Sequence, residues 1–324
     1  MKQVLMSQTA TALVKVLAGV KEGEKVLILT DFSTQEDIAP ALASVAYSLK
    51  AEPIIMSMVT RDTHGAALPE AVAAAMKNVN VVIAPTRYNI AHTRARFEAQ
   101  EAGARVLILP EAHENILLSK GLTADFVGLR PKAERLQELL TNGKLVRVTT
   151  EKGTDFTVSI EGRNGRALTG FANTKDISAA HCIESSIAPL EGTGRGTLII
   201  DGSIPGVGLI ETTPVIVTIE EGRAVSIEGG KEAEKFKGIL QKRDDELGNI
   251  YKVGEFGIGL NPECELENSM LSDEGVFGTV HIALGTNAYI GGVVEAKGHY
   301  DMVMKNATVE IDGKIVLKNK ELFI

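Results

Sequence analysis

Four short apolar runs near the start of the chain constrain its fold more than any other feature of the sequence. They occupy residues 26–29, 53–56, 81–84 and 106–109. Segments of helical periodicity separate them, as the spacing of Ile38, Leu42 and Val45 illustrates. Continuous apolar strands that alternate with helices are typical of a parallel sheet covered on both faces. We therefore expect an α/β N-terminal domain with a mostly parallel sheet over residues 1–142.

The pattern changes after a predicted helix that ends at Asn142-Gly143, a typical helix stop signal. Turn dipeptides such as Asn164-Gly165 then become frequent, and short β-branched runs lie between them. These are signals of antiparallel hairpins. We expect residues 143–324 to form a β-rich α+β C-terminal domain with one helix near residues 231–247.

Composition and short motifs exclude several classes of function. The formal net charge of -8 argues against a nucleic-acid partner, because phosphate binding relies on basic patches. The two cysteines, Cys182 and Cys264, imply no disulfide framework and favour a reducing, cytoplasmic setting. The chain shows no signal peptide and no apolar stretch long enough for a bilayer, so we expect no membrane partner. Neither a G-x-G-x-x-G motif nor a P-loop follows the first apolar run, which excludes a dinucleotide role.

His299 and Asp301 are two residues apart in the C-terminal half. In a strand, residues i and i+2 point to the same face, so the imidazole and the carboxylate would project together. A shared metal ion requires such an arrangement. A hydrogen-bonded His–Asp pair on a sheet surface would fit the same spacing.

Other ionisable residues lie in apolar surroundings. His281 has apolar neighbours on both sides and is either a metal ligand or a satisfied core histidine. Glu255 lies among glycines and large apolar residues, and it needs a metal ion or a basic partner because burying an unpaired charge is costly. Glu184 likewise needs either a metal ion or a basic partner if it is buried. Surface roles are expected for three further histidines, His64, His92 and His113.

Three sequence elements occur in order: Gly-Glu at 254–255, His-Ile-Ala-Leu-Gly at 281–285 and His-x-Asp at 299–301. This series resembles the metallo-aminopeptidases of the aminopeptidase T type, peptidase family M29, over most of the chain. The resemblance implies two divalent metal ions, held by Glu184, Glu255, His281, His299 and Asp301. It also implies a tyrosine near the metals, for which Tyr289 is the candidate, and a homodimer.

The function that this resemblance implies is a cytosolic aminopeptidase that removes N-terminal residues from small peptides. Carboxylate and imidazole ligands suit Zn, Co or Mn. Glu255 would bridge the two ions, which would share a hydroxide and polarise the peptide carbonyl. Glu184 would act as a ligand or as the catalytic base, and Tyr289 would hydrogen-bond the oxyanion.

Two alternatives stay open. The wider superfamily includes ring-opening dioxygenases that act on dihydroxypyridines and hold one non-haem iron at the same place. His281, His299 and Asp301 would suffice for such an Fe(II) site. Two ions are expected if Glu184 and Glu255 also face the metal, and one ion if they turn away. The third hypothesis is a non-enzymatic relative that binds a small ligand, and widely separated ligand side chains would support it.

Overall fold

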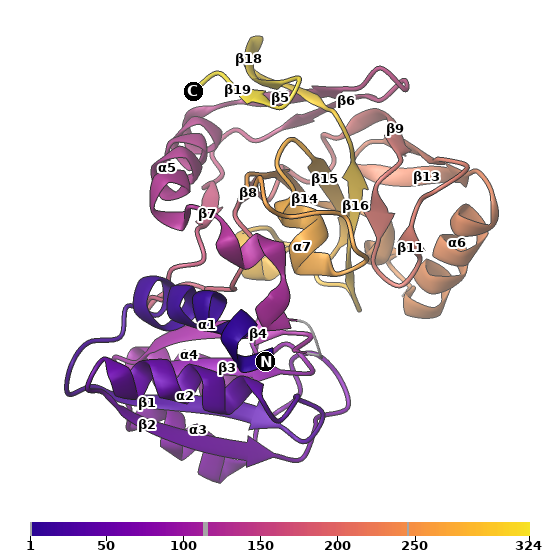
Figure 1. Cartoon of the computed structure of the whole chain (residues 1–324). Helices are drawn as coiled ribbons and strands as arrows, with labels where there is room; N and C mark the ends of the chain where they lie inside the picture. The colour runs from indigo at the N-terminus through magenta and orange to yellow at the C-terminus, as the bar shows by residue number, and fades with distance from the viewer. Residues whose placement is uncertain (1, 113–115, 245) are drawn as a thin grey trace. The chain divides into compact units, whose positions relative to one another are not determined.

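The computed structural model describes residues 2–112, 116–244 and 246–324 (Figure 1). The chain forms two compact units, Met1–Phe126 with Leu168–His181 and Val127–Ala167 with Cys182–Ile324. This division differs from the predicted boundary after residue 142. The segment 168–181 returns to the first unit because it forms β-bridges to the parallel sheet there, Val106 to Asn173 and Ile108 to Ala179.

The first unit contains a four-stranded parallel sheet with the order β2-β1-β3-β4. Its strands are β1 (Lys25–Asp31), β2 (Glu52–Met58), β3 (Val81–Thr86) and β4 (Arg105–Pro110). Its helices are α1 (Lys2–Thr11), η1 (Ala12–Leu17), α2 (Ile38–Ser48), α3 (Glu70–Lys77), α4 (Arg94–Glu101), η2 (Ile116–Leu118) and η3 (Lys120–Thr123). Helix α1 packs beside α2, and α3 packs beside α4. Each strand contains one of the four apolar runs, which confirms the predicted α/β class.

The second unit is built on antiparallel pairs. An eight-stranded sheet has the order β13-β12-β9-β6-β5-β17-β18-β19, and a five-stranded sheet has the order β16-β15-β14-β8-β7. The first sheet comprises β5 (Leu145–Thr149), β6 (Asp155–Ser159), β9 (Arg195–Ile200), β12 (Val215–Glu220), β13 (Arg223–Glu228), β17 (Thr308–Ile311), β18 (Lys314–Lys318) and β19 (Glu321–Leu322). The second comprises β7 (Arg166–Leu168), β8 (Glu184–Ile187), β14 (Val253–Gly259), β15 (Val280–Gly285) and β16 (His299–Met304). This part confirms the predicted β-rich α+β class.

Helices and short elements complete the second unit. They are α5 (Phe126–Asn142), α6 (Lys231–Arg243), α7 (Met270–Gly275), η4 (Asn249–Tyr251), η5 (Ala288–Ile290) and the strand pair β10 (Ser203–Ile204) and β11 (Gly208–Leu209). Helix α6 is the helix predicted near 231–247. Among the described residues, no helix has both the length and the apolar character that crossing a bilayer requires.

The five-stranded sheet forms the interior of the second unit. Every residue of β14 and of β15 is buried. These two strands pair with each other, β14 also pairs with β8, and β15 also pairs with β16 (Figure 1). Polar side chains on these strands are therefore removed from water and need partners within the protein or a bound ion.

Phe156 provides a test of packing in the eight-stranded sheet. Its side chain is fully buried in β6, whereas Phe323 of the same unit is 54% exposed. We expect Phe156→Ala to lower the free energy of unfolding by about 3–5 kcal/mol, because it removes a buried ring and leaves a cavity. Phe323→Ala should change it by no more than about 0.5 kcal/mol. Urea denaturation of both variants measures the difference, and equal effects would contradict this packing.

Candidate metal centre

The pairing of β15 with β16 places three predicted ligand residues on one face of the five-stranded sheet. His281 is in β15, and Ala283 and Gly285 share its face because residues two apart in a strand point the same way. Asp301 lies opposite Ala283, and His299 lies opposite Gly285. Residues opposite each other in adjacent strands point to the same side of the sheet. His281, His299 and Asp301 therefore leave the same face.

The two predicted glutamates lie on this face as well. Glu255 of β14 is opposite Ala283, and Glu184, the first residue of β8, is opposite Gly259. Gly259 is four residues beyond Glu255 in the same strand and so shares its face. Four strands, β8, β14, β15 and β16, thus contribute side chains to one buried patch.

The ligand atoms of these side chains lie close together. His299 Nε2 is 3.0 Å from Glu255 Oε2 and 3.2 Å from Asp301 Oδ1. His281 Nε2 is 3.6 Å from Glu184 Oε2. Two sets have all their ligand atoms within 4.8 Å of one another, and both sets include Glu255. Ligand atoms at right angles around an ion, with bonds of about 2.1 Å, lie about 3.0 Å apart, so this spacing suits a metal ion.

Glycines in β14 make the close approach possible. A Cβ atom at Gly257 would lie 2.1 Å from His281 Nε2, so the imidazole lies directly across this glycine. A Cβ atom at Gly259 would lie 2.5 Å from the carbonyl oxygen of Glu274. The glycines around Glu255 thus leave room for a histidine ring and for the chain that follows α7.

A hydrogen bond to the backbone holds the ring of His299 in one orientation. Its Nδ1 donates a hydrogen bond to the carbonyl oxygen of Thr286 at 2.8 Å, since a carbonyl can only accept. Nε2 then faces the carboxylates of Glu255 and Asp301. A hydrogen bond from the second ring nitrogen to a backbone carbonyl is typical of metal-binding histidines. Burial lowers the pKa of His299, but Asp301 and Glu255 more than compensate and raise it well above its usual value.

The buried carboxyls differ in charge. Burial raises the pKa of Glu184 to about 7, although His281 acts in the opposite direction. Burial also opposes ionisation of Asp301 and Glu255, but the neighbouring His299 holds the pKa of both below their usual values. The site therefore contains carboxylates and imidazoles in a setting from which water is largely excluded.

Several buried polar atoms of the centre make no hydrogen bond with any described residue. They include Glu184 Oε2, Glu274 Oε1 and His281 Nδ1. Unsatisfied buried oxygens beside carboxylates are costly, and a bound cation would satisfy them. The donor set of imidazole nitrogens and carboxylate oxygens is one that divalent transition metals accept. The residues present therefore fit a metal ion.

Glu274 of α7 is a member of the centre that the sequence did not indicate. It is 8% exposed, and it shares a hydrogen bond with Asp301. Burial, followed by the charges of Asp301 and Glu184, raises its pKa well above the usual value, so Glu274 is the protonated donor to Asp301. Cys182, Glu184 and Glu274 also have ligand atoms within 4.8 Å of one another. Residues 272–275, Ser-Asp-Glu-Gly, are polar or small, and their burial in α7 is seen only in the structure.

Tyr289 lies beside the centre in η5. Its ring meets the His299 ring edge-on, with 5.6 Å between the centroids and 67° between the planes. The residue is 41% exposed, but burial of the hydroxyl and the nearby charges of Glu255 and Asp301 raise its pKa well above the usual value. The phenol is therefore protonated at neutral pH.

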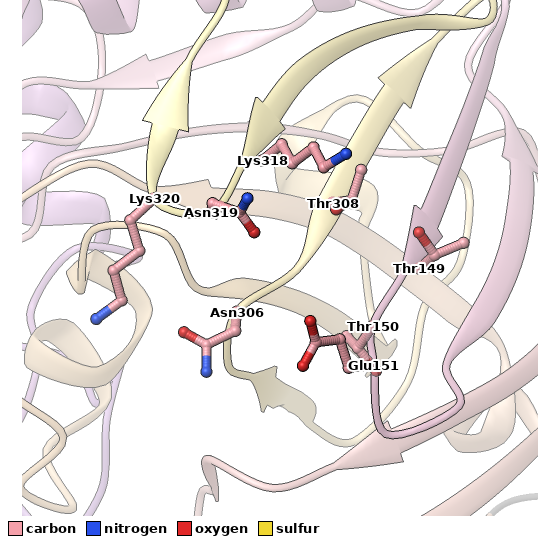
Figure 2. Close-up of a pocket in the computed structure, with 8 residues that line it drawn as sticks. All are labelled: Thr149, Thr150, Glu151, Asn306, Thr308, Lys318, Asn319 and Lys320. Atoms are coloured by element: carbon pink, nitrogen blue, oxygen red, sulfur yellow. The ribbon is translucent and has the colours of Figure 1, made fainter.

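The remaining sequence candidates lie elsewhere. His64 and His92 are in exposed turns of the first unit, and His113 lies outside the described residues. A cavity of about 510 Å³ at the end of the eight-stranded sheet is lined by Glu151, Lys318 and Lys320, among others (Figure 2). None of its lining residues is buried, and none belongs to the metal-ligand set. It offers no competing site for a catalytic metal.

Comparison with known proteins identifies the family. The sequence model of the NicX family, 2,5-dihydroxypyridine 5,6-dioxygenase, matches residues 8–323. The chain belongs to this family. The 2,5-dihydroxypyridine 5,6-dioxygenase of Pseudomonas putida KT2440 is 23% identical over 240 residues, which cover 70% of this chain and 66% of that relative.

Two solved structures share the fold of this NicX-family chain. The 2,5-dihydroxypyridine dioxygenase from Pseudomonas putida KT2440 superimposes with a TM-score of 0.83 at 20% identity and covers 99% of this chain and 98% of its own. Wild-type AmpT from Thermus thermophilus superimposes with a TM-score of 0.69 at 16% identity and covers both chains completely. The fold is therefore common to a dioxygenase and to AmpT.

The prediction of an aminopeptidase is wrong, because the family that matches nearly the whole chain is a dioxygenase family. The predictions of a hydrolase and of a protease are wrong with it, and two Zn, Co or Mn ions lose their support. Glu184 and Glu255 do face the centre, which was the sign expected of two ions. The number of carboxylates therefore does not decide the reaction.

The dispersed side chains expected of a non-enzymatic relative are not observed among the described ligand residues.

The raised pKa of Glu184 makes the stability of the metal-free protein depend on pH. This carboxyl keeps its proton up to about pH 7 in the folded protein, whereas its ordinary value is 4.5. The folded state therefore binds more protons than the unfolded state in this window, and the free energy of unfolding should fall as the pH rises through it. Thermal melting with a chelator at several pH values measures the fall. Glu184→Gln should reduce it and Glu161→Gln, at an exposed position, should not; an unchanged slope in Glu184→Gln would refute this account.

Gly257→Ala should displace the imidazole of His281, because the new Cβ atom would overlap its Nε2. We expect metal affinity to fall by at least about tenfold. Gly238→Ala is the matched control, since a Cβ atom at that position in α6 meets no atom within 4 Å. Isothermal titration with a divalent metal compares the variants, and wild-type affinity in Gly257→Ala would show that His281 is not a ligand.

Proposed function

We propose that this chain is a mononuclear non-haem iron dioxygenase that opens the ring of a dihydroxylated pyridine. The observation that carries this proposal is that His281, His299 and Asp301 leave one buried sheet face in a member of the NicX family. Glu255 is common to the two ligand clusters there, one with His281 and the other with His299 and Asp301. Two histidines and one carboxylate with open coordination positions are typical of Fe(II) oxygenases.

The residues proposed to hold the ion are His281, through Nε2, His299, through Nε2, and Asp301. Glu255 lies within 3.0 Å of His299 Nε2 and is available as a further ligand or as an acceptor for a metal-bound group. When bound, Fe(II) would supply the oxygen chemistry that ring cleavage requires. Thr286 contributes by fixing the His299 ring, so that its Nε2 lone pair is directed at the ion.

Glu184 and Tyr289 are the groups proposed to handle the substrate. A carboxyl with a pKa of about 7 can hold or accept a proton near neutral pH, so Glu184 suits proton transfer with a ring hydroxyl of the substrate. The phenol of Tyr289, which is protonated, can donate a hydrogen bond to an oxygen or a ring nitrogen. A homodimer and a cytoplasmic location remain expectations from the sequence.

The test is anaerobic reconstitution with Fe(II), followed by addition of 2,5-dihydroxypyridine and oxygen. We expect one ion per chain and equal consumption of substrate and O2. His299→Ala and Asp301→Asn should reduce turnover to background, because each removes a ligand. His64→Ala, at an exposed position in the first unit, should retain full activity. Absence of O2 uptake with release of N-terminal residues from short peptides would overturn the proposal.

A further inference from the structure

The loop between β15 and β16, residues 286–298, joins the strands that carry His281 and His299. It contains Tyr289, and its residue Thr286 accepts the hydrogen bond from His299 Nδ1. The loop contains three glycines, Gly291, Gly292 and Gly298, and two of its large hydrophobic residues, Tyr289 and Val293, are exposed. A loop of this composition needs anchoring contacts to hold one conformation.

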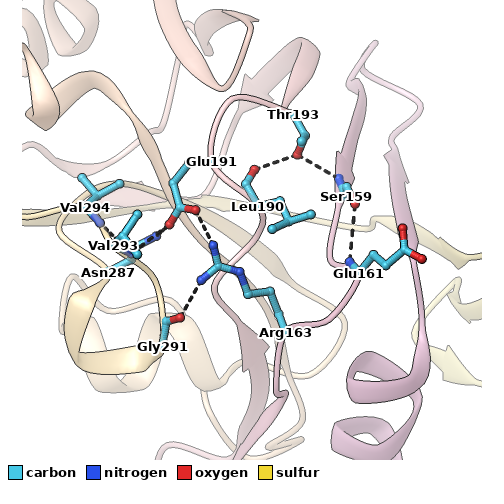
Figure 3. A network of polar contacts seen from close by, with 10 residues as sticks. All are labelled: Ser159, Glu161, Arg163, Leu190, Glu191, Thr193, Asn287, Gly291, Val293 and Val294. Atoms are coloured by element: carbon cyan, nitrogen blue, oxygen red, sulfur yellow. Dashed lines mark hydrogen bonds and ion pairs between the residues drawn. The ribbon is translucent and has the colours of Figure 1, made fainter.

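Glu191 provides the central anchor, from the turn between β8 and β9 (Figure 3). Its Oε1 accepts hydrogen bonds from Asn287 Nδ2 at 3.1 Å and from the amide of Val293 at 2.9 Å. Its Oε2 forms an ion pair with Arg163, which extends from the turn between β6 and β7. Burial would raise the pKa of Glu191, but these donors lower it overall, so the side chain is ionised at neutral pH.

Arg163 binds the same loop at a second point. Besides Glu191, its guanidinium donates a hydrogen bond to the carbonyl oxygen of Gly291 (Figure 3). The side chains of Arg163 and Glu191 are only 15% and 22% exposed. Removing one partner of a shielded pair leaves the other charge without compensation, so losing Glu191 or Arg163 costs more than losing one partner of an ion pair on the open surface.

Asn287 links the residues that Glu191 holds to the rest of the loop through hydrogen bonds. Its side chain is fully buried, and its Oδ1 accepts a hydrogen bond from the amide of Val294 at 2.7 Å. Its backbone amide donates to the carbonyl of Val294 at 3.0 Å, and the amide of Thr286 donates to the carbonyl of Gly298 at 2.8 Å. A Cβ atom at Gly292 would lie 2.1 Å from Asn287 Cγ, so the loop folds tightly over this side chain.

The anchored loop contacts His299 on two sides. The carbonyl of Thr286, the residue before Asn287, holds Nδ1 of the ring, and the Tyr289 ring packs against the imidazole edge-on. Neither contact involves Glu191 directly, but both belong to the segment whose backbone Glu191, Arg163 and Asn287 fix. A shift of this segment would rotate the imidazole that faces Glu255 and Asp301.

We propose that Glu191 is a positioning residue for the metal centre: with Arg163 and Asn287 it fixes the loop 286–298, and through Thr286 and Tyr289 it orients His299 for metal binding. This inference rests on the proposed function to the extent that His299 is a metal ligand. It does not depend on which substrate is oxidised. Glu191 itself touches neither the metal-ligand set nor the site of reaction.

The test uses Co(II) as the probe, because its absorption reports the geometry of its ligands. In Glu191→Ala we expect the dissociation constant for Co(II) to rise by about tenfold or more, the range found when partners of metal-ligating histidines are removed. The Co(II) spectrum should change, and the amides of Val293 and Val294 should exchange faster with deuterium. Glu191→Gln keeps an acceptor for Asn287 and Val293, so its affinity should stay closer to that of the wild type.

Glu161→Ala is the matched control. Glu161 lies in the same turn as Arg163 but forms its ion pair with Lys144 and makes no contact with the loop (Figure 3). It should leave Co(II) affinity and spectrum unchanged. Wild-type Co(II) affinity and spectrum in Glu191→Ala would overturn the proposal, even if the loop amides exchanged faster. If the wild type binds Co(II) but does not turn over 2,5-dihydroxypyridine after it is loaded with Fe(II), the proposed function is overturned and the positioning role stands.

Discussion

Burying several carboxylates beside two imidazoles on one sheet face is the constraint on which the rest of the second unit depends. Each charge loses its hydration when β14 and β15 are covered, and repulsion among Glu184, Glu255 and Asp301 adds to this cost. His299 compensates part of it in the metal-free protein, through the carboxylates of Glu255 and Asp301. A divalent cation would compensate the remainder, which couples metal binding to the stability of the unit.

The surrounding structure supplies what such a patch needs. Antiparallel register places four strands so that their polar side chains converge, and glycines in β14 give the imidazole of His281 room to lie across the strand. Contacts from outside the sheet then fix the orientation of individual side chains. Glu274 donates to Asp301, and Thr286 accepts from His299. The side chains proposed as metal ligands are held rigidly, because the strands that carry them and the residues that hydrogen-bond to them are both packed.

Much of the fold could be predicted from the sequence, because the strands of a parallel sheet are encoded as continuous apolar runs. The inner part of the sheet, β1, β3 and β4, is buried as expected, whereas the edge strand β2 is largely exposed. The domain boundary could not be predicted, since residues 168–181 join β4 through isolated bridges and contain no strand pattern.

At the metal centre, the sequence predicts His299 and Asp301 from the period of a strand, and it predicts His281 and Glu255 from the order of motifs. Glu274 and Glu191 act through contacts distant in sequence; Glu191 and Asn287 are 96 residues apart. The reaction could not be predicted from the ligands, because the dioxygenase and AmpT share this fold.

The return of residues 168–181 to the first unit has a consequence for synthesis. The open edge of β4 is covered by Asn173 and Ala179, which leave the ribosome long after the strand itself. Until then the nascent sheet has unpaired backbone groups along a strand of apolar residues, a surface prone to association with other chains. The N-terminal unit therefore cannot complete its folding as a leading segment. It must wait for helix α5 and the first hairpin of its neighbour to be synthesised.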